Sequence, residues 1–365
     1  MESKTWLCVV VLTCLHALIS DDAAAIEPDP NGYFIFCLCM GRFGNQAEHF
    51  LGGLAFAKAI NRTFILPPFR TNKNIPFDEW FSVESVERYH RVITAERFMN
   101  ELADRVWPEN KRFGFCYQLP QNPPCDATSA RGGGKLTTFW DELGVEFVDT
   151  VRYSTSYAYP SQWIIEFPPS KYPVIATRGA PAAFPMHQSH APLQKYLDFS
   201  NHLKADTHQL IQKHFNGSKN FIAVHLRNNV DWIRACELVG RTDTQTPSKL
   251  MSSYQCVGFD YGKTLTYDMC FPSHETVIKK LKQIVDLENP EYLFIATDKN
   301  PMLSEFKKEF PNLKLVFLDP HLPILDIALM TEAKHFIGNC VSSFSAFVWR
   351  YRRYHDKGPS SHFGM

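Results

Sequence analysis

Apolar residues along this chain of 365 residues occur in short continuous runs, and stretches with helical spacing follow them. Tyr33 to Leu38 has the length and the aromatic and isoleucine content of a buried β-strand. A helical period then places five apolar residues on one face: Ala47, Phe50, Leu51, Leu54 and Ala57. Thr63 to Leu66 has the pattern of a second strand, which ends before Pro67. The segment therefore predicts a βαβ unit of a parallel sheet.

The turn between the first strand and the helix has the sequence Gly41-Arg42-Phe43-Gly44-Asn45-Gln46. The handedness of a βαβ unit puts this turn at the carboxyl edge of the sheet, where free N–H groups and the helix dipole attract an anion. Arg42 adds a cation that can contact phosphate oxygens in a bidentate manner. The pattern indicates a phosphate or nucleotide pocket. It matches neither G-x-G-x-x-G nor the Walker loop, so a structural turn with a surface arginine is the alternative.

The second half of the chain repeats the alternation of strands and helices. Strands are expected at Phe221–Leu226, Tyr292–Ala296, Leu313–Leu318 and Phe336–Gly338, and helices at 193–215, 273–287, 302–310, 326–336 and 342–354. This alternation predicts a second parallel, doubly wound sheet. The expected fold class is therefore α/β and GT-B-like, with two Rossmann-like lobes that face each other across a cleft.

Three regions are expected along the chain. Residues 1–25 form a signal peptide with its cleavage region, residues 26–190 an N-terminal Rossmann-like lobe with a linker, and residues 191–365 a C-terminal Rossmann-like lobe that binds the donor. The linker is the stretch from Arg178 to Pro192, which is rich in Pro, Ala and His.

Composition and charge narrow the class of protein. Apolar residues make up 45% and charged residues 21%, which is typical of a soluble globular chain. Lys and Arg equal Asp and Glu at 38 each, so the net charge argues against nucleic acid as a partner.

The N-terminus has the layout of a secretory signal peptide. Lys4 precedes an apolar run from Trp6 to Ile19, and a polar stretch with small residues follows. The run is too short to span a membrane comfortably, and no later segment reaches its length, so no membrane span is expected. A signal anchor is the alternative.

The cysteines fit a secreted chain. Without Cys8 and Cys14 of the signal, eight of the ten cysteines remain, and an even number in that compartment indicates four disulfides. Metal binding is the alternative, but the chain has no pair of C-x-x-C motifs. Asn61 and Asn216 begin N-x-Ser/Thr sequons and are expected glycosylation sites.

Polar residues follow several expected strands or begin expected helices in the second half. His225 and Arg227 close the strand Phe221–Leu226, Asp326 opens a helix, and Ser342-Ser343-Phe344 begins the last helix. Each of these has a structural alternative, such as a buried core histidine or an ordinary N-cap. Their common position at strand ends and helix starts favours a nucleotide-sugar site.

Three motifs carry a resemblance to a known family. Gly41 to Ala47, His225-Leu226-Arg227 with Asp231-Trp232, and Ile337 to Phe344 closely resemble the protein O-fucosyltransferase 1 family, the peptide-O-fucosyltransferases that act on EGF-like repeats. The resemblance covers essentially everything after the signal, including the cysteines. It implies a GT-B fold, GDP-fucose as donor and inversion at the anomeric carbon.

The resemblance also implies a set of site residues. Arg227 and Asn45 are the expected catalytic residues. The expected donor-binding residues are Arg42, Phe43, Gly44, Asn45, His225, Leu226, Arg227, Asp326, Ser343 and Phe344. Arg227 is expected to neutralise the leaving diphosphate, Asp326 to accept hydrogen bonds from guanine or ribose, and Phe344 to pack on the base.

The same resemblance implies the disulfides Cys37–Cys39, Cys116–Cys125, Cys236–Cys270 and Cys256–Cys340. It places the protein in the lumen of the endoplasmic reticulum, although a KDEL-like retrieval signal is not seen at the terminal Met365. No metal is expected, because the chain contains no Asp-x-Asp and Arg42, Arg227 and the helix N-termini can neutralise the diphosphate. No cofactor beyond the donor substrate is expected.

The expected function is therefore inverting transfer of fucose from GDP-fucose to Ser or Thr hydroxyls of folded EGF-like domains. The expected partners are such domains in secreted or cell-surface proteins, for example Notch receptors. The alternatives are an O-fucosyltransferase for thrombospondin-type repeats and a non-catalytic luminal protein that binds nucleotide sugar or acts as a chaperone.

Overall fold

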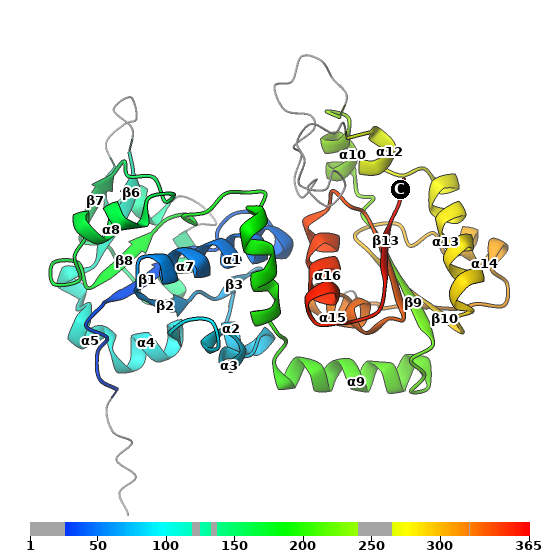
Figure 1. Ribbon diagram of the computed structural model, residues 1–365, viewed down its shortest axis with the longest axis horizontal. Coiled ribbons are helices and arrows are strands. Elements are labelled where there is room, and N and C mark those ends of the chain that lie inside the picture. The colour runs from blue at the N-terminus through cyan, green and yellow to red at the C-terminus, as the bar shows by residue number, and fades with distance from the viewer. Residues whose placement is uncertain (1–25, 119–124, 133–136, 240–264, 321) are drawn as a thin grey trace, which may run out of the picture.

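The computed structural model describes residues 26–118, 125–132, 137–239, 265–320 and 322–365. These residues form two lobes that lie side by side, each built around a parallel β-sheet with helices packed on it (Figure 1). The predicted α/β class with the two-lobed GT-B arrangement is confirmed. The expected signal peptide lies outside the described residues.

A six-stranded parallel sheet forms the centre of the N-terminal lobe, in the order β5-β2-β1-β8-β6-β7. Strand β1 (Tyr33–Phe36) pairs in parallel with β2 (Thr63–Leu66), and helix α1 (Phe43–Ala59) connects them, which confirms the predicted βαβ unit. Both strands are buried along their whole length because helices cover both faces of the sheet.

The other elements of this lobe are shorter. They are β3 (Phe69–Arg70), β4 (Asn74–Ile75), α2 (Phe77–Trp80), α3 (Val83–Glu87), β5 (Val92–Thr94), α4 (Ala95–Glu101), α5 (Ala103–Val106), the 3-10 turn η1 (Glu109–Lys111), β6 (Phe113–Tyr117), α6 (Ala127–Arg131), α7 (Thr137–Glu142), β7 (Asp149–Tyr153), α8 (Pro160–Glu166), β8 (Val174–Thr177) and the 3-10 segment η3 (Gln188–Tyr196).

Helix α1 starts one turn earlier than the apolar pattern predicted. The pattern placed its start at Ala47, whereas the helix begins at Phe43. Its first turn contains Gly44 and Asn45, which face Ser343 of the other lobe rather than the core of their own lobe. These two residues are not apolar, so the apolar pattern did not include them in the helix. The five apolar residues predicted for one face are all fully buried.

A five-stranded sheet forms the C-terminal lobe, in the order β11-β10-β9-β12-β13, and its strands are also parallel. Its elements are α9 (Asn201–Phe215), β9 (Phe221–Leu226), α10 (Val230–Cys236), α12 (Tyr267–Cys270), α13 (His274–Glu288), β10 (Tyr292–Thr297), α14 (Leu303–Glu309), β11 (Lys314–Phe317), α15 (Pro323–Glu332), β12 (His335–Gly338), α16 (Ser343–Tyr354) and β13 (Ser360–His362). Strand β9 lies between β10 and β12 and is parallel to both, so the carboxyl ends of these three strands lie at the same edge of the sheet.

The single helix predicted over residues 193–215 is wrong. The 3-10 segment η3 ends at Tyr196, and α9 begins only at Asn201. Ser200 accepts a hydrogen bond from the N–H of Leu203 at 3.1 Å, and such a side-chain cap begins a new helix. The predicted lobe boundary after residue 190 falls inside η3 and stays a prediction.

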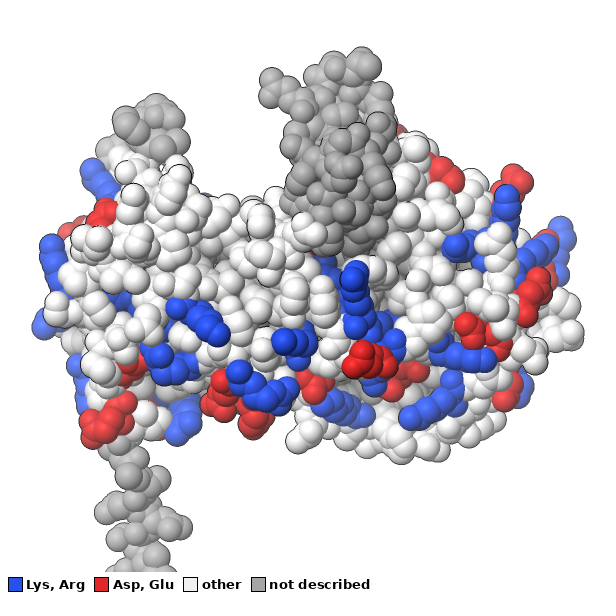
Figure 2. Space-filling view, viewed as in Figure 1, with Lys and Arg blue, Asp and Glu red and all other residues white. Residues whose placement is uncertain are grey.

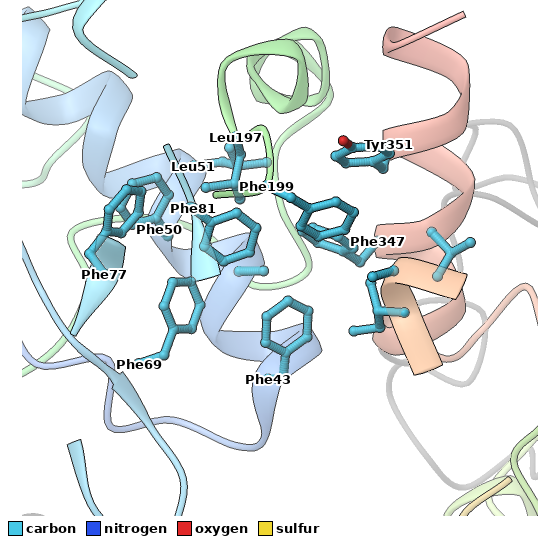
Figure 3. Close-up of a cluster of buried hydrophobic side chains, with 14 of the residues drawn as sticks. Phe43, Phe50, Leu51, Phe69, Phe77, Phe81, Leu197, Phe199, Phe347 and Tyr351 are labelled. Atoms are coloured by element: carbon cyan, nitrogen blue, oxygen red, sulfur yellow. The ribbon is translucent and has the colours of Figure 1, made fainter. Parts of the chain in front are cut away.

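The core continues from one lobe into the other. In Figure 3, Phe347 of α16 lies near Phe43 and Phe81 of the N-terminal lobe, and Tyr351 of α16 lies beside Phe199 of the segment between η3 and α9. The ring centroid of Phe347 is 5.0 Å from that of Phe43 and 6.1 Å from that of Phe81, and Tyr351 stacks on Phe199 at 4.5 Å. Aromatic pairs of this kind add to the area that they bury, so the contact between the lobes is apolar and closely packed.

A buried ion pair crosses the same contact. Nη1 of Arg350 on α16 lies 3.2 Å from Oε1 of Glu48 on α1, and the two side chains are 4% and 1% exposed. The other carboxylate oxygen of Glu48 accepts a hydrogen bond from the N–H of Met186 at 3.0 Å. The pair therefore links both lobes to the segment that connects them.

Three of the four expected disulfides join described residues: Cys37–Cys39, Cys116–Cys125 and Cys236–Cys270. Cys340 is disulfide-bonded as well, and its expected partner Cys256 lies outside the described residues.

The sequon residues Asn61 and Asn216 are both exposed in turns after helices, in positions that a glycan can occupy.

Charges of both signs are interspersed on the face shown in Figure 2, which agrees with the balanced composition. Within the described ranges, no helix has the length and apolar character needed to cross a membrane.

Candidate active site

Arg227 lies at the carboxyl edge of the second sheet, directly after β9. Its Nη2 donates to Oδ2 of Asp231 at 2.6 Å, and its Nη1 is paired with Asp298, which follows β10. The guanidinium also lies over the ring of Trp232, with 5.2 Å from Cζ to the ring centroid. The Arg227 side chain is 14% exposed, so the cation is held in place at the surface of the site.

The charges of two arginines act on Asp231. Burial acts to raise the pKa of Asp231, but the hydrogen bond and the charge of Arg227, together with the charge of Arg42, lower it below its usual value. Arg42 belongs to the N-terminal lobe and Arg227 to the C-terminal lobe, so the positive potential of both lobes reaches this carboxylate.

His225 is directed toward the start of α16. Its Nδ1 lies 2.6 Å from the hydroxyl of Ser345, and its ring centroid lies 4.8 Å from that of Phe344. The same Ser345 hydroxyl accepts a hydrogen bond from the N–H of Asn339 at 3.1 Å. These contacts join the carboxyl ends of β9 and β12 to the first turn of the last helix. Leu226 points to the other side of β9, into the core.

Asp326 lies in the first turn of α15 and is 2% exposed. The helix begins three residues before the start predicted at Asp326, with Pro323 in its first turn, a position that proline favours. Asp326 is thus part of the wall of the C-terminal lobe, whereas Arg42 of the other lobe is exposed at the surface.

The glycine turn of the N-terminal lobe meets the last helix directly. The hydroxyl of Ser343 donates to Oδ1 of Asn45 at 2.6 Å. A Cβ atom added at Gly44 would lie 2.6 Å from the backbone carbon of Ser343 and 2.7 Å from the N of Phe344. Only glycine permits this approach, so the N-termini of α1 and α16 face each other at close range.

The remaining residues of the turn are fixed by hydrogen bonds and packing. Gly41 has a φ of +73°, a conformation that favours glycine. The side chain of Gln46 donates to the carbonyl of Gly41 at 3.2 Å and to that of Arg70 at 2.9 Å. Phe43 is buried against Phe347. Arg42 precedes α1 as its N-cap residue, and its side chain makes no capping hydrogen bond.

This arrangement is suited to binding an anion with two negatively charged groups. Two helix N-termini and two arginines gather where the lobes meet, and both features attract phosphate. Ser342 occupies the N-cap position of α16, at the expected start of the last helix, and its side chain makes no capping hydrogen bond. Among the residues that the structure describes, no group of His, Cys, Asp and Glu side chains is arranged to hold a metal ion.

A cavity of about 570 Å³ lies at the carboxyl edge of the first sheet. Its lining includes Met40, Tyr117, Tyr157, Trp163 and Arg178. Met40 is 57% exposed and stands two residues before Arg42, so the cavity begins next to the glycine turn.

Contacts place eight of the ten expected donor-binding residues at this meeting of the lobes, whereas Leu226 points into the core and Asp326 is buried in the first turn of α15. The expected site residues did not include Asp298, Ser345 or Asn339, although Asn339 lies within the motif Ile337 to Phe344. Asp298 and Asn339 both follow strands, at the same edge as Arg227, and this position was the signal that identifies them.

Comparisons with known proteins agree with this geometry. The family model described as GDP-fucose protein O-fucosyltransferase matches residues 33–355. GDP-fucose protein O-fucosyltransferase 1 of Caenorhabditis elegans is 36% identical over 370 residues, which cover 94% of this chain and 93% of the relative.

Solved structures are similar as well. The crystal structure of POFUT1 in complex with GDP is 36% identical, with a TM-score of 0.85, and the match covers 93% of this chain and 100% of that one. The crystal structure of POFUT1 in complex with GDP-fucose is 35% identical with the same TM-score of 0.85, and the match covers 92% of this chain and 99% of that one. On the span and identity of these matches, the chain belongs to the GDP-fucose protein O-fucosyltransferase family.

Proposed function

We propose that the protein is an inverting glycosyltransferase that moves fucose from GDP-fucose to Ser or Thr hydroxyls of folded EGF-like domains. The observation that carries the proposal is the contact between Asn45 and Ser343, which brings together two helix N-termini and the two arginines at Asp231. Its relatives include POFUT1, whose crystal structures hold GDP and GDP-fucose. Family membership supports the same donor here.

The donor diphosphate binds between the lobes. Cleavage of the bond from fucose to GDP leaves negative charge on the β-phosphate, and Arg227 stabilises that charge through its planar guanidinium. Arg42 and the N–H groups at the start of α1 and α16 contribute further positive potential. These residues supply the charge that a metal ion supplies in other nucleotide-sugar enzymes, and we propose that none is required.

The rest of the donor set positions the nucleotide and the sugar. Asp326 accepts hydrogen bonds from guanine or ribose, and Phe344 packs on the base. The Ser343 hydroxyl lies at the diphosphate and orients Asn45 by donating to its Oδ1, so that Nδ2 of Asn45 is available to the reacting groups. His225 holds Phe344 and the first turn of α16 in place.

The acceptor approaches from the N-terminal lobe. The cavity beside Met40 offers an aromatic surface for a folded domain next to the proposed position of the sugar. We further propose that residues 26–190 and 191–365 act as separate acceptor and donor lobes, and that the enzyme works in the lumen of the endoplasmic reticulum on proteins such as Notch receptors.

The test measures release of GDP from GDP-fucose by the purified protein in three reactions: with a folded EGF-like domain, with a thrombospondin-type repeat, and without acceptor. Fucose attached to the EGF-like domain, identified by mass spectrometry, supports the proposal. Transfer to the thrombospondin-type repeat alone supports the related fucosyltransferase instead. A protein that binds GDP-fucose but produces no GDP in any reaction is a non-catalytic binding protein.

A further inference from the structure

The guanidinium of Arg227 contacts two carboxylates at once. Asp298 pairs with Nη1, and Asp231 pairs with Nη2 at 2.6 Å. Both terminal nitrogens of the guanidinium are thus occupied, and the two carboxylates offset the charge of Arg227 that would attract a diphosphate. A donor phosphate therefore reaches this guanidinium only if one of the carboxylates moves away.

Asp298 is the carboxylate that is fixed. Its side chain is 15% exposed, and its second oxygen accepts a hydrogen bond from the N–H of Asn228 at 2.8 Å. The side chain of Asn228 in turn donates to the carbonyl of Asn300 at 2.7 Å and accepts from its N–H at 2.9 Å. The bonds between Asn228 and Asn300 fix the acceptor site that holds Asp298, so Asp298 loses the hydrogen bond from the N–H of Asn228 if it turns away from Arg227.

Asp231 is the carboxylate that can move. Its side chain is 50% exposed and lies in the first turn of the short helix α10, where rotation about its side-chain bonds brings the carboxylate into solvent. It also lies within the field of Arg42, so it occupies a place to which both arginines attract negative charge. A diphosphate carries more charge than one carboxylate and competes for that place.

We infer that the two carboxylates have opposite roles: Asp298 holds Arg227 in position, whereas Asp231 occupies the place of the donor β-phosphate and gives way to it. This inference rests on the proposed function, because it assigns the β-phosphate to Arg227. Asp298 is then a positioning residue that acts through Arg227. Asp231 keeps the guanidinium correctly oriented between turnovers and weakens the hold of the enzyme on GDP, which favours product release.

The first test compares the affinities of the wild-type protein and Asp231→Asn for GDP and for GMP by calorimetry at low ionic strength. Loss of the competing carboxylate is expected to tighten GDP binding about two- to fivefold, the range of an exposed ion pair. The effect on GMP, which lacks the β-phosphate, is expected to be smaller. Asp286→Asn, an exposed carboxylate of α13, is the control and should change neither affinity. Unchanged or weaker GDP binding by Asp231→Asn would overturn the inference.

The second test uses Asp298→Asn, which keeps an acceptor for the N–H of Asn228 but removes the charge next to Arg227. Turnover of GDP-fucose is expected to fall about 10- to 100-fold, as when other groups that orient a reactive side chain are removed. The ratio of GDP to GMP affinity should also fall, whereas the affinity for GMP should not. An equal loss of both affinities indicates a merely structural residue and contradicts the assignment.

The outcomes separate the inference from the proposed function. If the wild-type protein binds neither GDP nor GDP-fucose, the proposed function fails. If it binds GDP but both aspartate variants behave like wild type, only the inference fails. If Asp298→Asn does not fold, the GDP affinity of Asp231→Asn decides alone.

Discussion

Replacement of Arg350 by methionine removes the cation from the buried ion pair that joins α1 to α16. The partner Glu48 is 1% exposed, so its carboxylate stays in the interior without the Arg350 guanidinium beside it. Breaking a buried pair in this way costs about 3–5 kcal/mol. The entropy of unfolding about 340 residues is about 0.7 kcal/mol/K, so the Tm is expected to fall by about 4–7 °C.

The double variant Glu48→Gln/Arg350→Met tests the electrostatic reasoning. Glutamine keeps an acceptor for the N–H of Met186 and removes the buried charge, so at least half of the lost stability is expected to return. Lys357→Met is the control, because Lys357 pairs with Glu332 at 2.8 Å but the two side chains are 34% and 29% exposed. It should cost less than about 1 kcal/mol.

Scanning calorimetry of these four proteins and of the single variant Glu48→Gln, all in one buffer, gives the required Tm values and the coupling between the two sites. A Tm for Arg350→Met that equals that of Lys357→Met would show that the pair contributes no more than a surface contact. A double variant less stable than Arg350→Met would show that the loss comes from packing rather than from the charge left behind.

Four further predictions follow from individual residues. Arg227→Lys keeps the charge but not the planar fork, so turnover should fall about 10²–10³-fold with a normal affinity for GMP, and a lysine variant with near wild-type turnover contradicts the bidentate contact. Burial lowers the pKa of His362 from its usual 6.5 to about 4, so the unfolded chain takes up a proton first as the pH falls. Unfolding in guanidinium should therefore reveal a loss of about 2 kcal/mol between pH 7 and pH 5 that His362→Leu does not show, and equal slopes for both proteins refute this. Transfer should continue in excess EDTA, and activity that returns only with a divalent ion would disprove metal independence. Titration of the denatured, unreduced secreted form should detect no free thiol, and two or more reactive thiols would rule out four disulfides.

Sequence reasoning succeeded where the chain carries a local pattern. The run Phe221–Leu226 predicted a strand with its observed ends, because a short, mostly apolar run of this length is typical of a strand buried on both faces. The same run placed Arg227 at the carboxyl edge of the sheet. Asp298 was missed because one aspartate after a strand is common, and its pairing with Arg227 depends on β9 and β10 being neighbours in the sheet.

Contacts between distant segments leave no local signal. Glu48 and Arg350 are separated by 302 positions, and each looks like an ordinary polar residue of a helix. The break between η3 and α9 was missed for a different reason. The apolar residues on both sides of Ser200 keep a helical spacing, and only the hydrogen bond to Leu203 shows where the new helix begins.

The ring contacts of Phe347 with Phe43 and Phe81 have a consequence for any attempt to divide the molecule. A gene cut at the connecting segment would encode two fragments, each with part of a common aromatic interior exposed to water. Such surfaces drive fragments to aggregate when they are made separately, and to reassemble when they are made together. During synthesis, the aromatic surface of the N-terminal lobe is therefore covered only after α16, close to the end of the chain, has been made. Each lobe depends on the other to complete its folding.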